Sequence, residues 1–165
     1  MAGLMLAACG SSGSGSPAPQ TSPPEATASP TASSPASAPE GSAATVSLKS
    51  VKGIEDPALV GPDGKTVYLF EGDKNGKPTC AGACTQFWPP VTVSSMPSTG
   101  SGLDKSLLGT VKRADGSTQV TYAGHPLYYY SGDASPGTAL GQGMSAFGAE
   151  WYVLNAKGSK IDEDS

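Results

Sequence analysis

The sequence is short of charge, of histidine and of long apolar runs. Only 15% of its 165 residues are charged, and ten Lys and Arg face fourteen Asp and Glu, for a net charge of −4. Because phosphate backbones are held by clustered basic side chains, the scattered positive charges argue against a nucleic-acid partner. No run of about 18 apolar residues occurs, so no membrane-spanning helix is predicted. One histidine and no nucleophile-elbow motif leave a hydrolase without a triad, and we expect no enzyme.

The first nine residues, MAGLMLAAC, bear on where the protein resides. Their last four, Leu6 to Cys9, resemble the bacterial lipobox, in which the cysteine is lipidated and becomes the mature N-terminus. The apolar stretch before Cys9 is short and no Lys or Arg precedes it. The alternative is an incidental cysteine in an unstructured terminus. We predict a signal remnant over 1–9 and a lipid anchor at Cys9, on the outer face of the bacterial cytoplasmic membrane.

Residues 10–45 consist almost entirely of Gly, Ser, Pro, Ala, Thr and Gln. Such a segment buries too little apolar surface to offset its ordering entropy, so we expect a disordered linker. It would span roughly 110 Å as polyproline II, or about 30 Å as a flexible coil. Every Phe, Trp and Tyr lies between 68 and 152, which places the folded domain at 46–160 and an acidic tail at 161–165.

The folded part contains an internal repeat. The segment GKTVYLFEGD at 64–73 matches GHPLYYYSGD at 124–133, and each copy is followed by a tryptophan, Trp88 or Trp151. The aromatic and β-branched runs between turn formers indicate short strands. Only 102–111, with leucines at i, i+4 and i+5, could form a helix of one or two turns.

These features predict an all-β domain, a small sheet or barrel-like fold built from two related β repeats. Repeat one covers about 60–95 and repeat two about 120–156. The tandem motifs YLFEGD at 68–73 and YYYSGD at 128–133 resemble those of the bacterial secreted-repeat lipoproteins, which carry Tyr-x-aromatic-x-x-Asp in tandem. The resemblance covers about 60–155. It implies an exported, lipid-anchored envelope protein and no established activity.

Cys80 and Cys84 allow two interpretations. Outside the cytoplasm disulfides persist, and lipidation of Cys9 would leave this pair even. We favour a structural disulfide, worth roughly 2 kcal/mol across so short a loop.

The alternative is a copper or thiol-redox site. Soft thiolates suit Cu(I) and imidazole suits copper generally, so Cys80, Cys84 and His125 would form it, with Met96 or Met144 as weak ligands. A zinc site needs about four ligands, and only Cys80, Cys84 and His125 are available. We expect no cofactor, with copper as the alternative.

Asp73 and Asp133 end the two aromatic segments. They could be paired cation ligands or binding carboxylates. The segment DKNG at 73–76 resembles the start of a calcium loop, but position 12 of that loop is a cysteine rather than Glu. We favour a structural role, with each carboxylate capping backbone N–H groups after its strand.

The aromatic side chains also have two interpretations. With strand periodicity, the two motif aromatics of each repeat share one face. We favour a core; the alternative is a groove for glycan or peptide. The residues concerned are Tyr68, Phe70, Trp88, Tyr128, Tyr130 and Trp151.

The sequence thus predicts a lipid-anchored cell-envelope protein that serves as a binding or structural module. Its ligand is not evident; a cell-wall glycan or another envelope protein are the partners we consider besides the membrane. The alternative function is a copper-binding or thiol-redox accessory protein that uses Cys80 and Cys84.

Overall fold

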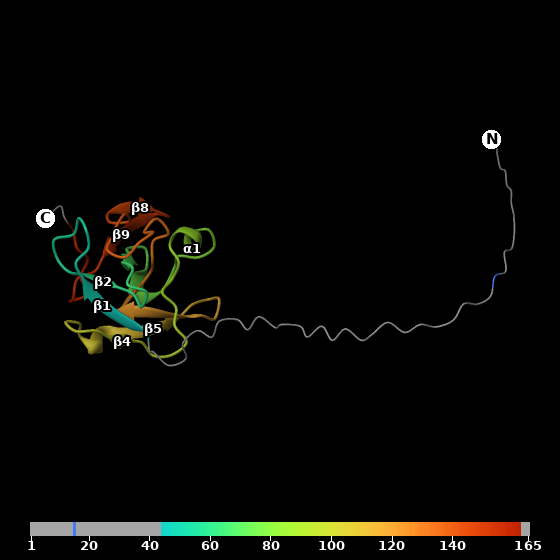
Figure 1. Ribbon diagram of the computed structural model, residues 1–165, viewed down its shortest axis with the longest axis horizontal. Coiled ribbons are helices and arrows are strands. Elements are labelled where there is room, and N and C mark those ends of the chain that lie inside the picture. Colours follow the sequence, from blue (N-terminus) through green and yellow to red (C-terminus); the bar gives the residue numbers. More distant parts are fainter. Residues whose placement is uncertain (1–14, 16–43, 163–165) are drawn as a thin grey trace, which may run out of the picture. The chain divides into compact units, whose positions relative to one another are not determined.

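The computed structural model describes residue 15 and residues 44–162, and every helix and strand lies in the second range (Figure 1). The predicted signal remnant, Cys9 and nearly all of the predicted linker lie outside the described residues. The elements are, in chain order, β1 Thr45–Lys49, β2 Ala58–Val60, β3 Tyr68–Phe70, the 3-10 turn η1 Lys74–Gly76, α1 Cys84–Phe87, β4 Ser98–Thr99, the 3-10 turn η2 Lys105–Leu107, β5 Leu108–Lys112, β6 Thr118–Tyr122, β7 His125–Pro126, β8 Met144–Ala146 and β9 Ala149–Val153.

The strands form three small three-stranded sheets, which confirms the all-β prediction. Their strand orders are β2-β1-β4, β3-β9-β8 and β5-β6-β7. All pairs within them are antiparallel except β1 with β4. The strands are two to five residues long, because turn formers recur every few residues along this glycine- and proline-rich chain.

The two repeats meet at their aromatic segments, which are strand β3 in the first repeat and 128–130 in the second. Tyr68 and Tyr128 exchange backbone hydrogen bonds of 2.8 and 3.0 Å, as one antiparallel bridge. Strand β3 pairs with β9, which carries the tryptophan of the second repeat, and Tyr128 in turn bridges to the segment after the first repeat's tryptophan. In this way Phe70 lies opposite Trp151 in the β3–β9 ladder, and Pro90, just after Trp88, bridges to Tyr128. The repeats are therefore interlocked and share one folded unit.

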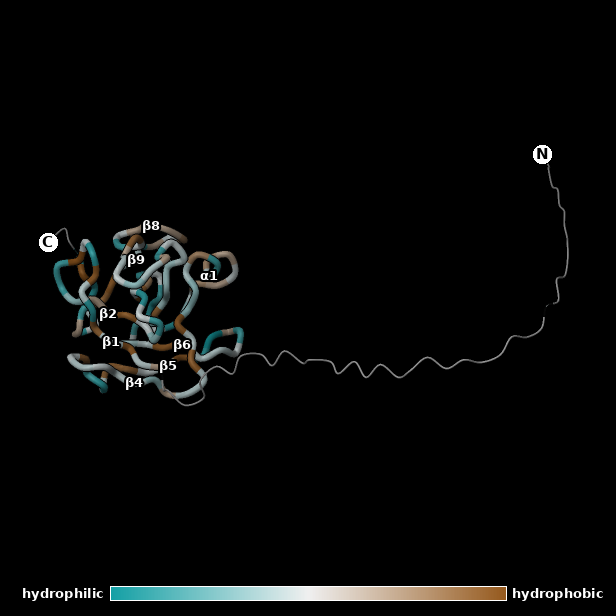
Figure 2. The backbone as a smooth tube through the Cα atoms, in the orientation of Figure 1, coloured by the Kyte–Doolittle hydropathy of each residue, from teal (hydrophilic) through white to brown (hydrophobic). Residues whose placement is uncertain are grey.

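Strand β3 and the residue before it are buried on both faces, with one apolar cluster on each side. Tyr68 and Phe70 belong to one cluster, and Val67 and Leu69 to the other, as the two-residue period of a strand requires. Figure 2 shows brown stretches along β1, β2, β5 and β6, alternating with paler residues, and much of the teal in the loops. The core therefore runs through the junction of the repeats.

Three local features differ from the sequence predictions. The helix considered over 102–111 is wrong, because only the single 3-10 turn η2 forms and strand β5 follows at once, paired along its length with β6. A one-turn helix, α1, instead begins at Cys84. Ile161, assigned to the tail, is buried, and its N–H donates to Val153. No helix among the described residues is long and apolar enough to cross a membrane.

Candidate binding site

The motif aspartates connect the repeats. The Tyr68 hydroxyl donates to Asp133 Oδ2 at 2.6 Å, and the Tyr128 hydroxyl donates to Asp73 Oδ2 at 2.7 Å. The other oxygen of Asp73 accepts the N–H and the hydroxyl of Thr79, and the other oxygen of Asp133 accepts the N–H of Leu140. Both carboxylates are buried. They cap backbone groups as predicted, but six and seven residues downstream, and the bonds across the repeats were not foreseen.

The aromatic residues form the core and leave little surface for a ligand. Four rings lie in one stack, in which Trp88 and Trp151 occupy the centre at 3.9 Å and 4°, and each packs on the motif aromatic of the other repeat. Tyr130, at one end of the stack, is half-buried. The other five aromatic side chains considered for a groove are at most 5% exposed. The groove for glycan or peptide is therefore wrong for Tyr68, Phe70, Trp88, Tyr128 and Trp151.

Cys80 and Cys84 are joined in a disulfide. The loop that they close is held by a buried cation: Arg113 donates to the carbonyl of Cys80 and to the side chain of Gln119, each at 2.6 Å. The sulfurs are thereby oxidised and buried, so they offer no thiolates for the alternative copper site. No group of three or more His, Cys, Asp or Glu side chains within residues 44–162 is placed to hold a metal ion, and His125 does not complete such a group with the cysteines.

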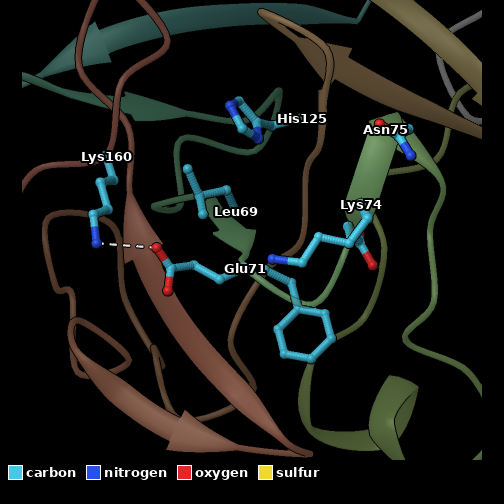
Figure 3. Close-up of a pocket in the computed structure, with 8 residues that line it drawn as sticks. Leu69, Glu71, Lys74, Asn75, His125 and Lys160 are labelled. Atoms are coloured by element: carbon cyan, nitrogen blue, oxygen red, sulfur yellow. Dashed lines mark hydrogen bonds and ion pairs between the residues drawn. The ribbon is translucent and has the colours of Figure 1, made fainter.

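A cavity of about 290 Å³ opens where β3 ends (Figure 3). Its lining combines apolar and charged side chains: Leu69, Phe70, Glu71, Asp73, Lys74, Asn75, His125 and Lys160. In the view of Figure 3, His125 lies near one end and Glu71 with Lys160 near the other, with Leu69 between them. The walls come from both repeats, because β3 and η1 belong to the first and β7 to the second.

Local backbone geometry positions Lys74 and Asn75, two of the hydrogen-bond donors that line this cavity. Asn75 and Gly76 have φ of 56° and 70°, so η1 turns sharply after Asp73. A Cβ on Gly76 would lie 2.8 Å from the carbonyl oxygen of Gly124, so the η1 loop packs directly on the turn that precedes His125. Only glycine permits this approach, which sets Lys74 and Asn75 beside the histidine.

The side chains of Lys74, Asn75 and His125 have no hydrogen bond or ion pair with the described residues. Burial lowers the pKa of His125 below its usual 6.5, and the carboxylate of Asp73 opposes this effect. Near neutral pH the ring is therefore uncharged and one of its nitrogens donates.

The acidic residues of the cavity are already engaged. Glu71 accepts from Lys160 at 3.0 Å, and this ammonium also pairs with Asp162 at 3.4 Å and lies 4.2 Å from the centre of the Tyr152 ring. The oxygens of Asp73 take the bonds described above. Apart from the second carboxylate oxygen of Glu71, the groups that remain open to a ligand among the described lining residues are donors.

Sequence reasoning found Asp73 and His125 but missed Glu71, Lys74, Asn75 and Lys160. The signal for two of these was present, since they stand in the DKNG segment that was set aside as an incomplete calcium loop. Lys160 carries no local signal, because it reaches Glu71 only through the fold.

The geometry defines an all-β domain of two interlocked repeats, closed by one disulfide, with a polar cavity at their junction. The chain belongs to a family of secreted repeats of unknown function, whose model matches it twice, at 51–92 and 109–155. This match confirms the two repeats and the family expected from the tandem motifs. No curated protein and no solved structure matches the chain.

Proposed function

We propose that this protein is a lipid-anchored binding module of the bacterial cell envelope, and that the cavity beside His125 takes a small anionic group. One observation carries the proposal. Three side chains whose donors have no partner among the described residues, Lys74, Asn75 and His125, line a cavity of about 290 Å³, while each carboxylate there already has a partner.

An anion fits this arrangement better than a cation. A charge-assisted hydrogen bond from Lys74 would be stronger than a bond between neutral groups. A bound anion would also favour the charged form of His125, which burial now disfavours. Ligand and histidine would therefore stabilise each other as the pH falls.

The cell wall is the natural source of such a group for an envelope protein. Carboxylate-bearing sugars and peptide carboxyl termini both present a planar anion of the right size. The lipobox-like segment ending at Cys9 and the long Ser- and Pro-rich segment after it support a tethered location.

Binding rather than catalysis is favoured by the side chains that line the cavity. Among the described lining residues, no serine, threonine or cysteine nucleophile faces a base, and His125 has no hydrogen-bonded partner to orient it. The arrangement provides donors for a ligand but no activated nucleophile.

The anchor is tested by growing cells that express the full chain with an alkyne-tagged fatty acid. Covalent label in the wild-type protein and none in Cys9→Ser supports the anchor. Label that persists in Cys9→Ser, or is absent from both, contradicts it.

The cavity is tested by calorimetric titration with N-acetylmuramic acid, a cell-wall sugar that carries a carboxylate. N-acetylglucosamine, which lacks the carboxylate, is the matched ligand control. We expect binding only of the acid, weakened about tenfold in Lys74→Gln by loss of a charged hydrogen bond. Lys77→Gln, an exposed neighbour outside the cavity, is the matched variant and should bind as wild type. Equal binding of both sugars, or of neither, contradicts the proposal.

A further inference from the structure

Two phenylalanine rings project from the domain beside each other. Phe87 at the end of α1 and Phe147 in the β8–β9 turn are 53% and 49% exposed, and their ring centroids lie 6.0 Å apart. Both are held on a rigid base. Phe87 precedes the buried Trp88 and follows the disulfide, and Phe147 precedes Trp151 by four residues on the adjacent hairpin.

The backbone conformation of Phe147 is unfavourable for an aromatic residue. The β8–β9 hairpin has a two-residue turn, Phe147–Gly148, with φ of 57° and 92°. Turns with positive φ at both positions favour Asn-Gly or Asp-Gly, and a bulky aromatic residue is rare at such φ. Strain of this kind persists where the side chain serves another purpose.

The two segments that carry these rings contain no charged residue. Residues 78–90 and 134–149, which contain both phenylalanines, include no Asp, Glu, Lys, Arg or His in a chain of net charge −4. Exposed Leu140 lies in the second segment. Of the two charges that flank this segment, Asp133 is buried, and Glu150 is exposed and accepts from the Tyr152 hydroxyl. Figure 2 shows the chain around α1 and β8 largely in pale to brown tones.

We propose that these two rings and the uncharged loops around them, the Phe face, dock on the surface of a lipid bilayer. Aromatic side chains with an uncharged surround enter the boundary of headgroups and acyl chains without burying a charge. This inference rests on the proposed anchor. With the anchor at Cys9, the 36 residues between it and the domain would span about 30 Å as a flexible coil, short enough for the domain to reach the membrane that holds it.

Docking is tested on the full chain carrying Cys9→Ser, so that no acyl chain contributes. Its flotation is measured with vesicles of phosphatidylethanolamine and phosphatidylglycerol. We expect flotation that falls about tenfold in Phe147→Asn, since part of one ring no longer enters the lipid. Asn suits the positive φ, so the melting temperature should stay equal or rise.

Met96→Asn is the matched control. Met96 is 63% exposed and lies two residues before β4, which Figure 1 draws at the opposite end of the domain from β8. This variant should float as the parent does.

Absent flotation, equal flotation of Phe147→Asn, or equal loss in Met96→Asn would overturn the proposal. A dimer in vesicle-free sedimentation that Phe147→Asn dissociates would overturn it too, in favour of contact between copies. None of these results bears on whether Cys9 is lipidated, which the fatty-acid label decides separately.

Discussion

The hydroxyl of Tyr68 donates a 2.6 Å hydrogen bond to the carboxylate of Asp133, which belongs to the other repeat. The same bond recurs in reverse between Tyr128 and Asp73. The Tyr and the Asp of each Tyr-x-aromatic-x-x-Asp motif therefore form a hydrogen bond with the other repeat and not with each other. Each motif supplies one donor and one acceptor to its counterpart, so the motif has its structural meaning only as a pair.

Loss of one such bond should lower the stability of the whole domain. Tyr68→Phe leaves the buried Asp133 with one acceptor site unfilled, and we expect a loss of about 1.5–3 kcal/mol in the free energy of unfolding. A double-mutant cycle with Asp133→Asn should show coupling of about 1 kcal/mol or more. Chemical denaturation of the four proteins measures it.

The control for this cycle is Tyr152→Phe, which removes a hydroxyl bonded to exposed Glu150. It should cost less than about 0.5 kcal/mol. Additive effects of the Tyr68 and Asp133 substitutions would show that the bond contributes nothing specific.

The same tyrosines predict a loss of stability in alkali. Burial, and then the hydrogen bond to aspartate, raise the pKa of Tyr68 and of Tyr128 above the usual 10. The unfolded chain releases these protons near pH 10 while the folded domain retains them. Stability is therefore full below pH 10 and falls as the pH rises above it.

Urea denaturation at about pH 8 and about pH 11 measures this fall. Tyr68→Phe removes one of the titrating groups and should reduce the loss of unfolding free energy between the two pH values. A midpoint that does not change between the two pH values would show that the hydroxyls ionise freely in the folded domain.

Two glycines should be equally intolerant of a side chain. A Cβ on Gly72 or on Gly132 would lie 2.4 Å from the ring of Phe70 or Tyr130, respectively. Because Phe70 packs on Trp151 and Tyr130 packs on Trp88, neither ring can shift without losing this contact. Gly72→Ala and Gly132→Ala should each lower the free energy of unfolding by about 1–3 kcal/mol.

Ser131→Ala, at an exposed neighbouring position, is the control for the glycine variants and should change little. Thermal unfolding compares the three. If one glycine variant were as stable as the wild type, the two halves of the stack would not be equivalent.

The disulfide should act as a local brace. Replacing Cys80 and Cys84 together by alanine should cost about 2 kcal/mol, the value for so short a loop. The oxidised chain should take up no Cu(I), as intact mass spectrometry can check. Stoichiometric copper on the reduced protein, lost in Cys84→Ser, would instead favour the redox alternative.

The sequence was sufficient for what depends on short-range pattern. Two-residue alternation in TVYLF and PLYYY predicted strands, and the match between 64–73 and 124–133 predicted two repeats. The two repeats and strand β3 in TVYLF were confirmed. The strand predicted for PLYYY was wrong beyond Pro126, because Tyr128 forms only isolated bridges and 129–130 pairs with no strand. The pairing of Cys80 with Cys84 was also foreseen, because four residues suffice to bring the two together.

The long-range pairing was beyond the sequence. Nothing in the repeat indicates that Trp151 stacks on Phe70 of the other copy rather than on its own Tyr130, because each copy carries an equivalent aromatic at this position. The cavity was missed for a related reason. Lys160 and Glu71 come into contact only because β3 of the first repeat pairs with β9 of the second.

The central claim, an anion site at the junction of the repeats, can be tested through His125. It is the only histidine in the chain, so its ring proton is identified in a one-dimensional NMR spectrum without assignment. Its pKa is measured by titration with and without saturating N-acetylmuramic acid. We predict a pKa below 6.5 in the free protein and a rise with the ligand, because a bound anion favours the imidazolium. An identical titration curve in both samples would contradict the account.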